Sequence, residues 1–273
     1  MTRIWFDQPL ETVATFWRVI RRDGVTLGFT AHDRDLWFEG TAHRAAPGMV
    51  PSAIRRSAGF EPDSAEVRGA LSHDALSAFD LAIGRFDGAR VMIGLVDWES
   101  LETHVVYRGT IGAVSEEAGT FAADLVSRKS ELQRDPVPRT SPSCRAEFCG
   151  PGCALSPAQF DHTGQLISFD PVQNAATVAT GAALASLAGG RLRWLDGPYA
   201  GQTAGIIGFD AGRLHLDNPL DQVPPVGTRV QLREGCDRRL ETCVTRFANA
   251  VNFQGEPFLP GNDLITRYPS APQ

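Results

Sequence analysis

Two pairs of cysteines, far apart in the sequence, constrain this chain more than any other feature. Cys144 and Cys153 form the first pair, and Cys236 and Cys243 form the second. The pairs stand at the two ends of a stretch of short β-type segments, so a site built from all four requires both ends of that module to meet. Cysteines grouped in this way are typical of a metal or iron–sulfur site. The fifth cysteine, Cys149, is then the spare.

The compartment of synthesis decides the redox state of these thiols. Residues 1–7 contain neither an apolar signal core nor a cleavage site, so we expect synthesis in the cytoplasm. Thiols stay reduced there, which favours a metal or a cluster over disulfides. No apolar run reaches the roughly 18 residues of a membrane span, and none is expected.

Composition predicts a mainly β protein with short helices. The 27 glycines and 18 prolines are spread along the chain, which indicates many turns and short strands. We expect an α+β fold: an N-terminal antiparallel β module, and a small C-terminal β-barrel or sandwich module closed by a four-cysteine site. The expected segments are 1–127 for the N-terminal module with one helix, 128–165 for a linker with the first cysteine pair, 166–234 for the barrel or sandwich, and 235–273 for the second pair, a helix and the C-terminal segment.

The N-terminal module is expected to begin with antiparallel strands over 12–45, with a hairpin turn at 22–24. A helix is expected over 74–86, where apolar residues recur at helical spacing and His73 or Asp74 can serve as the cap. Further strands are expected over 90–98, 104–107 and 121–126, and a short helix over 127–135.

The second module is expected to contain six short strands separated by turn signals. This number of strands in so short a stretch indicates a small barrel or sandwich. The expected strands are 166–169, 176–180, 191–195, 201–209, 213–216 and 228–232.

The spacing of the cysteines favours a cluster over a single ion. On one continuous helix Cys236 and Cys243 would lie about 10 Å apart, too far for two ligands of one zinc ion. A loop cysteine before a helix over 238–247, capped by Asp237, removes the difficulty because Cys243 then points toward Cys236. Eight residues separate the first pair and six the second, whereas structural zinc sites usually use C-x2–4-C pairs. This favours [4Fe-4S], with zinc as the alternative.

Arginines flank both pairs and could offset the negative charge of four thiolates. They are Arg145, Arg238, Arg239 and Arg246. The alternative is that these are buried free cysteines and surface arginines. His162 could serve as a further ligand, although an exposed turn accounts for it more simply.

Neither motifs nor charge point to catalysis or to nucleic-acid binding. The sequence holds no G-x-S-x-G, P-loop, H-E-x-x-H or G-x-G-x-x-G motif, so no enzymatic activity and no catalytic residue is expected. The His32-Asp33 stretch is typical of a solvated turn. The net charge is −6, whereas general nucleic-acid binders are usually basic, so no sequence-specific nucleic-acid binding is expected.

The motifs around the cysteines, together with those near both ends of the chain, resemble one family. They are Pro142-x-Cys144-Arg145-Ala146-x-Phe148, Gly235-Cys236-Asp237, Phe247-x-Asn249, Asn252-Phe253-x-Gly255-x-Pro257 and, in the N-terminal module, Arg22-Asp23-Gly24 with Gly28-Phe29-Thr30-x-His32-Asp33-Arg34-Asp35-Leu36. The chain resembles tail-tip baseplate hub proteins of long-tailed phages and gene transfer agents over nearly its whole length. It is more distantly similar to the tail tip protein of phage lambda, whose C-terminal region carries an iron–sulfur cluster.

The resemblance implies a structural, non-enzymatic role at the tail tip of a virion-like particle. It implies a homotrimer below the distal tail protein, which holds the tip peptidase and the large tip or fibre protein and supports DNA delivery. The cluster ligands carry over to Cys144, Cys153, Cys236 and Cys243, with Cys149 as a possible substitute. Two other classes stay open: an iron–sulfur electron-transfer or redox protein, and a zinc-stabilised binding module.

Overall fold

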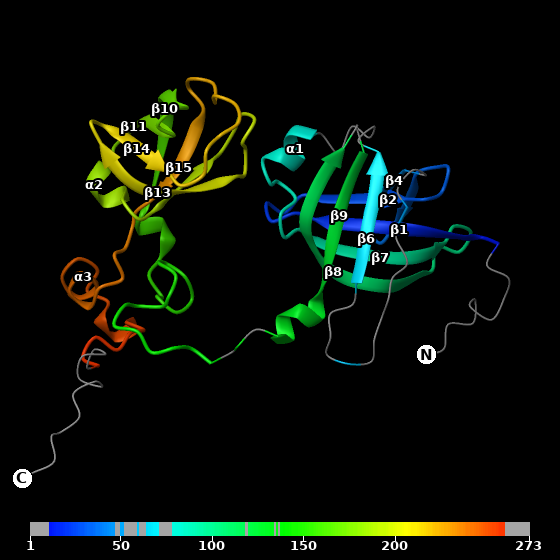
Figure 1. The fold of residues 1–273 in the computed structure, drawn as a ribbon, viewed down its shortest axis with the longest axis horizontal. Coiled ribbons are helices and arrows are strands. Elements are labelled where there is room, and N and C mark those ends of the chain that lie inside the picture. Colours follow the sequence, from blue (N-terminus) through cyan, green and yellow to red (C-terminus); the bar gives the residue numbers. More distant parts are fainter. Residues whose placement is uncertain are drawn as a thin grey trace, which may run out of the picture. The chain divides into compact units, whose positions relative to one another are not determined.

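The computed structural model describes residues 11–46, 50–51, 59, 64–70, 78–117, 120–133, 135 and 137–259. The chain forms two compact units, Met1–Asp135 and Pro136–Gln273 (Figure 1). Strands dominate the described part of both units and the helices are short, which confirms the mainly β prediction.

One nine-stranded sheet forms the first unit, in the order β3-β4-β2-β1-β7-β8-β9-β6-β5. Side chains of β1 alternate between its two faces, so Trp17 packs in one core with Phe29 and Phe86, while Phe16 packs in a second core with Phe38. The strands are β1 (Val13–Ile20), β2 (Thr26–Thr30), β3 (Leu36–Phe38), β4 (Thr41–Ala45), β5 (Val50–Pro51), β6 (Ser64–Ala70), β7 (Arg90–Asp97), β8 (Thr103–Glu117) and β9 (Thr120–Ser127).

The expectation of only antiparallel strands over 12–45 is wrong at one pair, because β2 and β4 are parallel. β3 and β4 form a tight hairpin whose turn residues Glu39 and Gly40 both have positive φ, 49° and 71°. This hairpin folds back so that β4, not β3, becomes the neighbour of β2. Sequence patterns do not reveal this order, since it depends on which hairpin strand buries more surface.

The buried residue that β4 contributes is His43, which has no exposed surface. Its ring stacks on Phe38 with the centroids 3.8 Å apart. Gly28 of β2 allows the close approach, since a Cβ there would lie 2.5 Å from the carbonyl oxygen of Ala42. The parallel pairing therefore depends on a glycine.

The helix expected over 74–86 is shorter in the described residues, where α1 covers Ala78–Ala82. The two caps proposed for it, His73 and Asp74, lie outside the described residues. The short helix expected after β9 is present as a 3-10 helix, η2 (Arg128–Gln133).

A closed six-stranded barrel forms the core of the second unit, in the order β10-β11-β14-β13-β12-β15. This confirms the barrel alternative of the predicted barrel or sandwich. Leu166, Leu192, Leu214 and Leu232 are almost completely buried inside it. A short helix that the sequence analysis missed, α2 (Leu184–Leu187), precedes β12. The strands are β10 (Asp161–Asp170), β11 (Ala175–Thr180), β12 (Arg191–Trp194), β13 (Thr203–Asp210), β14 (Arg213–Leu216) and β15 (Arg229–Arg233).

Candidate functional site

The barrel itself brings the two cysteine segments together. Its first and last strands, β10 and β15, are neighbours, and Asp161 pairs with Arg233 where both strands meet the segments outside the barrel. The segment before β10 and the segment after β15 therefore start from one edge. They are joined by backbone hydrogen bonds, among them one from the Cys144 N–H to the Arg238 carbonyl at 2.9 Å. Strand pairing thus brings both ends of the module together.

The four predicted cysteines, Cys144, Cys153, Cys236 and Cys243, all line one pocket. Its cavity volume is about 20 Å³, which is room for about one water molecule. Among the described residues, Cys149 is not part of this wall. The rest of the wall includes Phe148, Arg238, Arg239, Phe247, Asn249, Asn252 and Phe253.

Amide N–H groups point at three of these sulfur atoms. The Arg238 N–H donates to the Cys236 Sγ at 3.4 Å, and the Gln254 N–H donates to the Cys144 Sγ at 3.3 Å. The Cys153 Sγ accepts from a side-chain amide at 3.6 Å. Such donors stabilise a thiolate more than a thiol, and they are the usual outer contacts of metal-bound sulfur.

Asn249 supplies that side-chain amide, and it organises the pocket from a buried position, 6% exposed. Its Nδ2 donates to the Cys153 carbonyl oxygen at 2.7 Å, while its own backbone N–H donates to the Cys243 carbonyl at 2.9 Å. It therefore ties one cysteine of each pair to the other. The Phe247-x-Asn249 motif marked this residue in the sequence but did not indicate its role.

The thiols are close enough to influence one another. Burial raises the pKa of Cys243, and the neighbouring Cys144, Cys236 and Cys153 raise it further. Burial is also the largest cause that raises the pKa of Cys236. Protonated thiols are favoured in such a place until a cation or cluster takes the proton's position.

No disulfide joins the five cysteines, which are all free. In the part of the chain that is described, no three His, Cys, Asp or Glu side chains are placed to hold a metal ion. The four thiols surround a pocket rather than converge on one point. Their arrangement therefore differs from that of a closed tetrahedral zinc site.

The helix predicted over 238–247 is shorter and starts later, as α3 (Leu240–Thr245). Its N-cap is Arg239 instead of the predicted Asp237. Asp237 lies two residues before the cap, and its carboxylate accepts from the Arg239 N–H and the Thr242 hydroxyl at 3.0 and 2.7 Å. Cys243 does project from the helix into the pocket that the loop residue Cys236 lines, as predicted.

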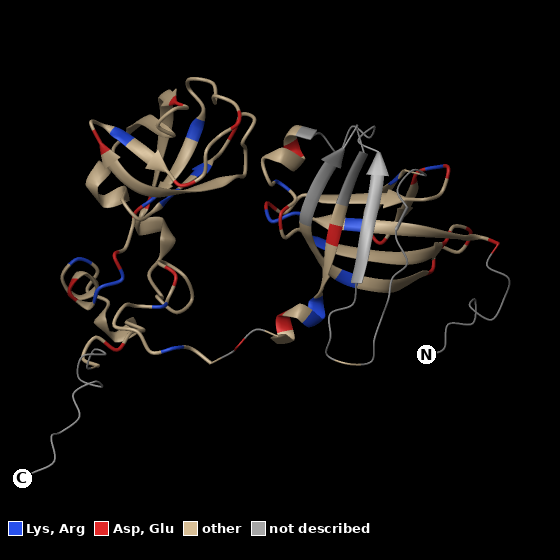
Figure 2. Ribbon diagram, viewed as in Figure 1, with Lys and Arg blue, Asp and Glu red and all other residues tan. Residues whose placement is uncertain are grey.

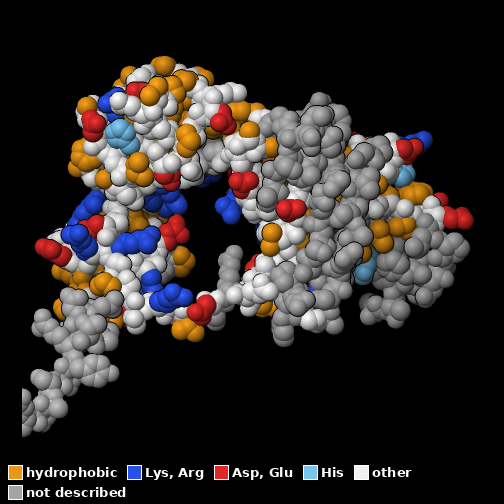
Figure 3. Space-filling model, in the orientation of Figure 1, with side chains coloured by type: hydrophobic (Ala, Val, Ile, Leu, Met, Phe, Trp, Pro, Cys, Tyr) orange, Lys and Arg blue, Asp and Glu red, His pale blue; other side chains and the backbone are white. Residues whose placement is uncertain are grey.

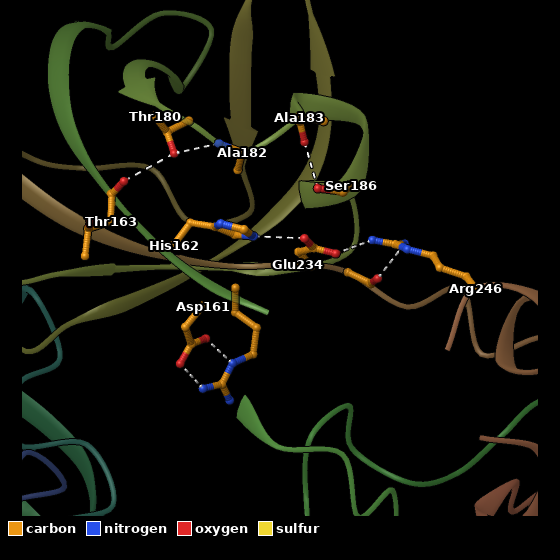
Figure 4. A network of polar contacts seen from close by, with 11 residues as sticks. Asp161, His162, Thr163, Thr180, Ala182, Ala183, Ser186, Glu234 and Arg246 are labelled. Carbon is orange, nitrogen blue, oxygen red and sulfur yellow. Dashed lines mark hydrogen bonds and ion pairs between the residues drawn. The ribbon is translucent and has the colours of Figure 1, made fainter. Parts of the chain in front are cut away.

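Ion pairs connect β10 with β15 and hold the segment after β15 at the same edge (Figure 4). The Arg233 guanidinium binds Asp161 through two hydrogen bonds of 2.6 Å. Beside them, Glu234 accepts from Arg246 and contacts the His162 Nε2 at 2.8 Å. The exposed turn expected at His162 is wrong, because His162 lies in β10 and is partly buried beside Glu234. It is outside the pocket wall in the described structure.

Basic side chains gather around the cysteine segments below the barrel, in the view of Figure 3. Arg238 and Arg239 line the pocket itself. Arg145 is turned to Glu256, 2.9 Å away, and this pair ties the first cysteine segment to the C-terminal one. Two of the four flanking arginines thus border the pocket, and the others connect segments around it.

In the described residues no helix has both the length and the apolar character of a membrane span.

Residues 4–156 match the family described as baseplate hub protein, N-terminal attachment domain, and 186–263 match one described as phage conserved hypothetical protein BR0599. A chain in a structure described as the virion of a native gene transfer agent particle is 32% identical, with a TM-score of 0.84 over 98% of this chain and 95% of that chain. No curated protein matches. The chain therefore belongs to the baseplate hub proteins, structural components of the virion tail tip.

Proposed function

We propose that this chain is a structural hub of a phage-like tail-tip baseplate whose second unit holds a [4Fe-4S] cluster. The cluster would be bound by Cys144, Cys153, Cys236 and Cys243. The observation that carries this assignment is that all four thiols, and not Cys149, line a single pocket. The hub role is supported by the family match over 4–156 and by the whole-length similarity to a chain of the gene transfer agent virion.

The chemistry of the pocket fits a cluster better than a single ion. Four thiols in two pairs are the usual ligands of a cubane cluster, and the N–H groups aimed at three of them are the usual outer contacts. The pocket has room for about one water molecule and its thiols do not converge on one point, so we expect the cysteine segments to rearrange when a cluster is loaded. They can do so because Cys144, Cys153 and Cys236 lie in loops outside the barrel.

The cluster would act as a cross-link. Bound to both cysteine pairs, it would join the segment that enters the barrel to the segment that leaves it, and cluster binding would stabilise their fold. The chain contributes the four thiolates, the donors to sulfur, and the nearby Arg238 and Arg239 that offset negative charge. This role needs no catalytic residue.

At the tip, we propose that three copies form a ring that connects the distal tail protein to the tip peptidase and to the large tip or fibre protein. Closed rotational symmetry is the common arrangement of identical subunits, and such rings use large interfaces. The ring would support DNA delivery without reading DNA sequence.

Metal analysis of anaerobically purified protein tests the cluster directly. We expect brown protein with about four iron and four sulfide per chain, as a cubane cluster requires. Visible absorption and a parallel zinc assay provide the readout. Colourless protein with one zinc per chain would reject the cluster in favour of a zinc-stabilised module, while leaving the hub role intact.

A further inference from the structure

The first unit carries a basic groove that the proposed function leaves unused. Two hollows, of about 180 and 230 Å³, share Arg108 and Arg128 in their walls. Arg90 lines the first hollow and Lys129 the second. We call the two together the arginine groove. Figure 2 shows basic positions at the start of η2, which forms one wall. The groove stands out because the chain as a whole has a net charge of −6.

Part of the positive charge of the groove has no acidic partner in the described residues, although Glu131 also lines the first hollow. Arg90 and Arg108 make no ion pair or hydrogen bond through their side chains in the described structure. The register places them diagonally on neighbouring strands, with Met92 opposite Arg108, so two like charges share one face. Arg128 has one carboxylate contact there, to Glu131 at 4.0 Å and largely exposed. An anion in the groove would relieve this repulsion.

The groove also borders one edge of β8. β9 ends at Ser127, opposite Gly109 of β8, so the part of β8 before Gly109 pairs only with β7 in the described sheet. Val105 and Val106, both partly buried, line the second hollow beside this edge. A strand edge that is open in this way can accept an added strand through main-chain hydrogen bonds.

We propose that the arginine groove binds an extended acidic segment of another tail protein, which adds as a strand to the edge of β8. Its carboxylates would contact Arg108 and Arg128, and its apolar side chains would pack on Val105 and Val106. The proposal rests on the hub role only for the source of the segment, and binding itself requires neither the cluster nor the ring.

A protein segment fits the groove better than nucleic acid does. The floor is apolar, with Ile20, Met92 and Val105 among its residues, whereas a phosphate backbone needs donors along its whole length. A strand with alternating acidic and apolar residues presents both kinds of side chain at once, because successive side chains point to opposite faces.

The test uses the full chain and a fluorescent peptide of about ten residues that alternates glutamate and valine, a length typical of a long strand. Fluorescence anisotropy should show saturable, salt-dependent binding. A peptide of the same length with lysine in place of glutamate should bind at least about tenfold more weakly, because the arginines repel it. The glutamate–valine peptide with every peptide nitrogen methylated should be weaker by a similar factor, since it has no N–H to donate to β8.

The protein variants separate this groove from general charge effects. Combined Arg108→Glu and Arg128→Glu should weaken peptide binding by at least about tenfold. Arg34→Glu combined with Arg44→Glu reverses two charges at exposed positions outside the groove, so it is the matched control and should leave affinity unchanged. Thermal unfolding checks that each variant is folded. If the double glutamate variant does not fold, the combined Arg108→Gln and Arg128→Gln variant replaces it.

Three results would overturn the proposal. One is equal binding of the glutamate, lysine and N-methylated peptides. Another is tighter binding of a DNA duplex than of the peptide, with the DNA binding abolished by the charge reversal, which would make the groove a nucleic-acid site. The third is reversible self-association of the wild-type chain, seen by sedimentation and abolished by the reversal, which would make a second copy the occupant. Iron content and particle assembly are measured separately, so a failure of the groove proposal does not affect the proposed hub role or the proposed cluster.

Discussion

At the scale of single residues, Cys149 and Cys153 are only four positions apart yet occupy different surroundings. Cys153 lines the pocket, whereas the pKa of Cys149, raised mainly by burial, is held down in part by the Arg233 guanidinium outside it. Cys149 also has a positive φ of 59°, which is unusual for a residue with a side chain and marks the tight turn between the two cysteines. The turn, not the spacing, decides which thiol faces the pocket.

This difference gives a matched pair of variants. Cys153→Ala should lower bound iron from about four per chain to below about one, because cluster binding needs every ligand. Cys149→Ala should retain the iron of the wild type. Iron and sulfide assays on anaerobically purified proteins check both, and the ligand assignment is wrong if the two variants exchange behaviour.

A second residue-scale feature is the buried His43 of β4. Its Nε2 accepts a hydrogen bond from Arg18 at 3.4 Å, so the ring nitrogen is held neutral beside a cation. Burial, with a further contribution from Arg18, lowers the pKa of His43 from 6.5 to about 4. The unfolded chain therefore binds a proton near pH 6 that the folded chain excludes.

Stability should consequently fall as pH drops. Neutral His43 contributes about 3 kcal/mol to the free energy of unfolding. This contribution is fully present above about pH 6.5, decreases between pH 6.5 and 4, and is lost below about pH 4. His43→Gln keeps an acceptor for Arg18 but cannot titrate. Urea unfolding of this variant and of the wild type therefore separates the pH dependence due to His43 from that due to other groups. Identical pH dependence of the two proteins would contradict the assignment.

At the scale of elements, the pairing of β10 with β15 decides where the site forms, and the ion pairs at that edge decide how firmly α3 is held. α3 carries Cys243, and Arg246 at its end binds both Glu234 and the Gly235 carbonyl, the latter at 3.2 Å. The Arg246 guanidinium also lies 4.8 Å from the centre of the Phe247 ring. These contacts connect a cysteine-bearing helix to the last barrel strand.

Arg246→Gln should therefore loosen α3 more than it destabilises the barrel. Cluster release to an iron chelator should become about tenfold faster, since outer contacts tune metal binding by such factors. The free energy of unfolding should change by only about 1 kcal/mol, because the pair is partly exposed. Arg213→Gln, which removes a barrel ion pair to Asp170 at 3.6 Å, is the control and should leave release unchanged. Equal release rates for all three proteins would show that α3 is held by other contacts.

At the scale of the whole molecule, two β units of similar size form one chain, and two family matches cover different parts of it. The hub family covers 4–156, and the second family covers 186–263. The first unit holds the arginine groove and the second holds the cysteine pocket. Because the two features lie in different units, each can be substituted without changing residues of the other.

Removal of the chain from particles should leave heads and tail tubes but no tip complex and no DNA delivery. Particle imaging should place wild-type copies as a three-fold ring at the tail tip, with large subunit interfaces. A complementing Cys149→Ala copy should restore delivery, because this residue is not proposed as a ligand. Infectious or transducing particles formed without the chain would refute the hub role.

The amino-acid sequence alone determined the elements and the chemistry that depend on local pattern. Alternating apolar residues and turn signals placed most strands of both units, since these reflect backbone preferences and burial of one face. They did not predict β5 or β6, and they predicted only the beginning of β8. The cysteine pairs alone identified the candidate site. Helices were less well placed: α2 lies in a run of small residues with little periodicity, and α3 begins three residues after Asp237.

Tertiary structure decided what depends on contacts between distant segments. The parallel pairing of β2 with β4 follows from burial of His43 against Gly28. The choice of Cys153 over Cys149 at the pocket follows from a turn with positive φ, and the role of Asn249 follows from hydrogen bonds that span the two segments. Local propensity carries no information on such pairings, because their free energy comes from surfaces that meet only after the sheet of the first unit has formed or the barrel of the second has closed.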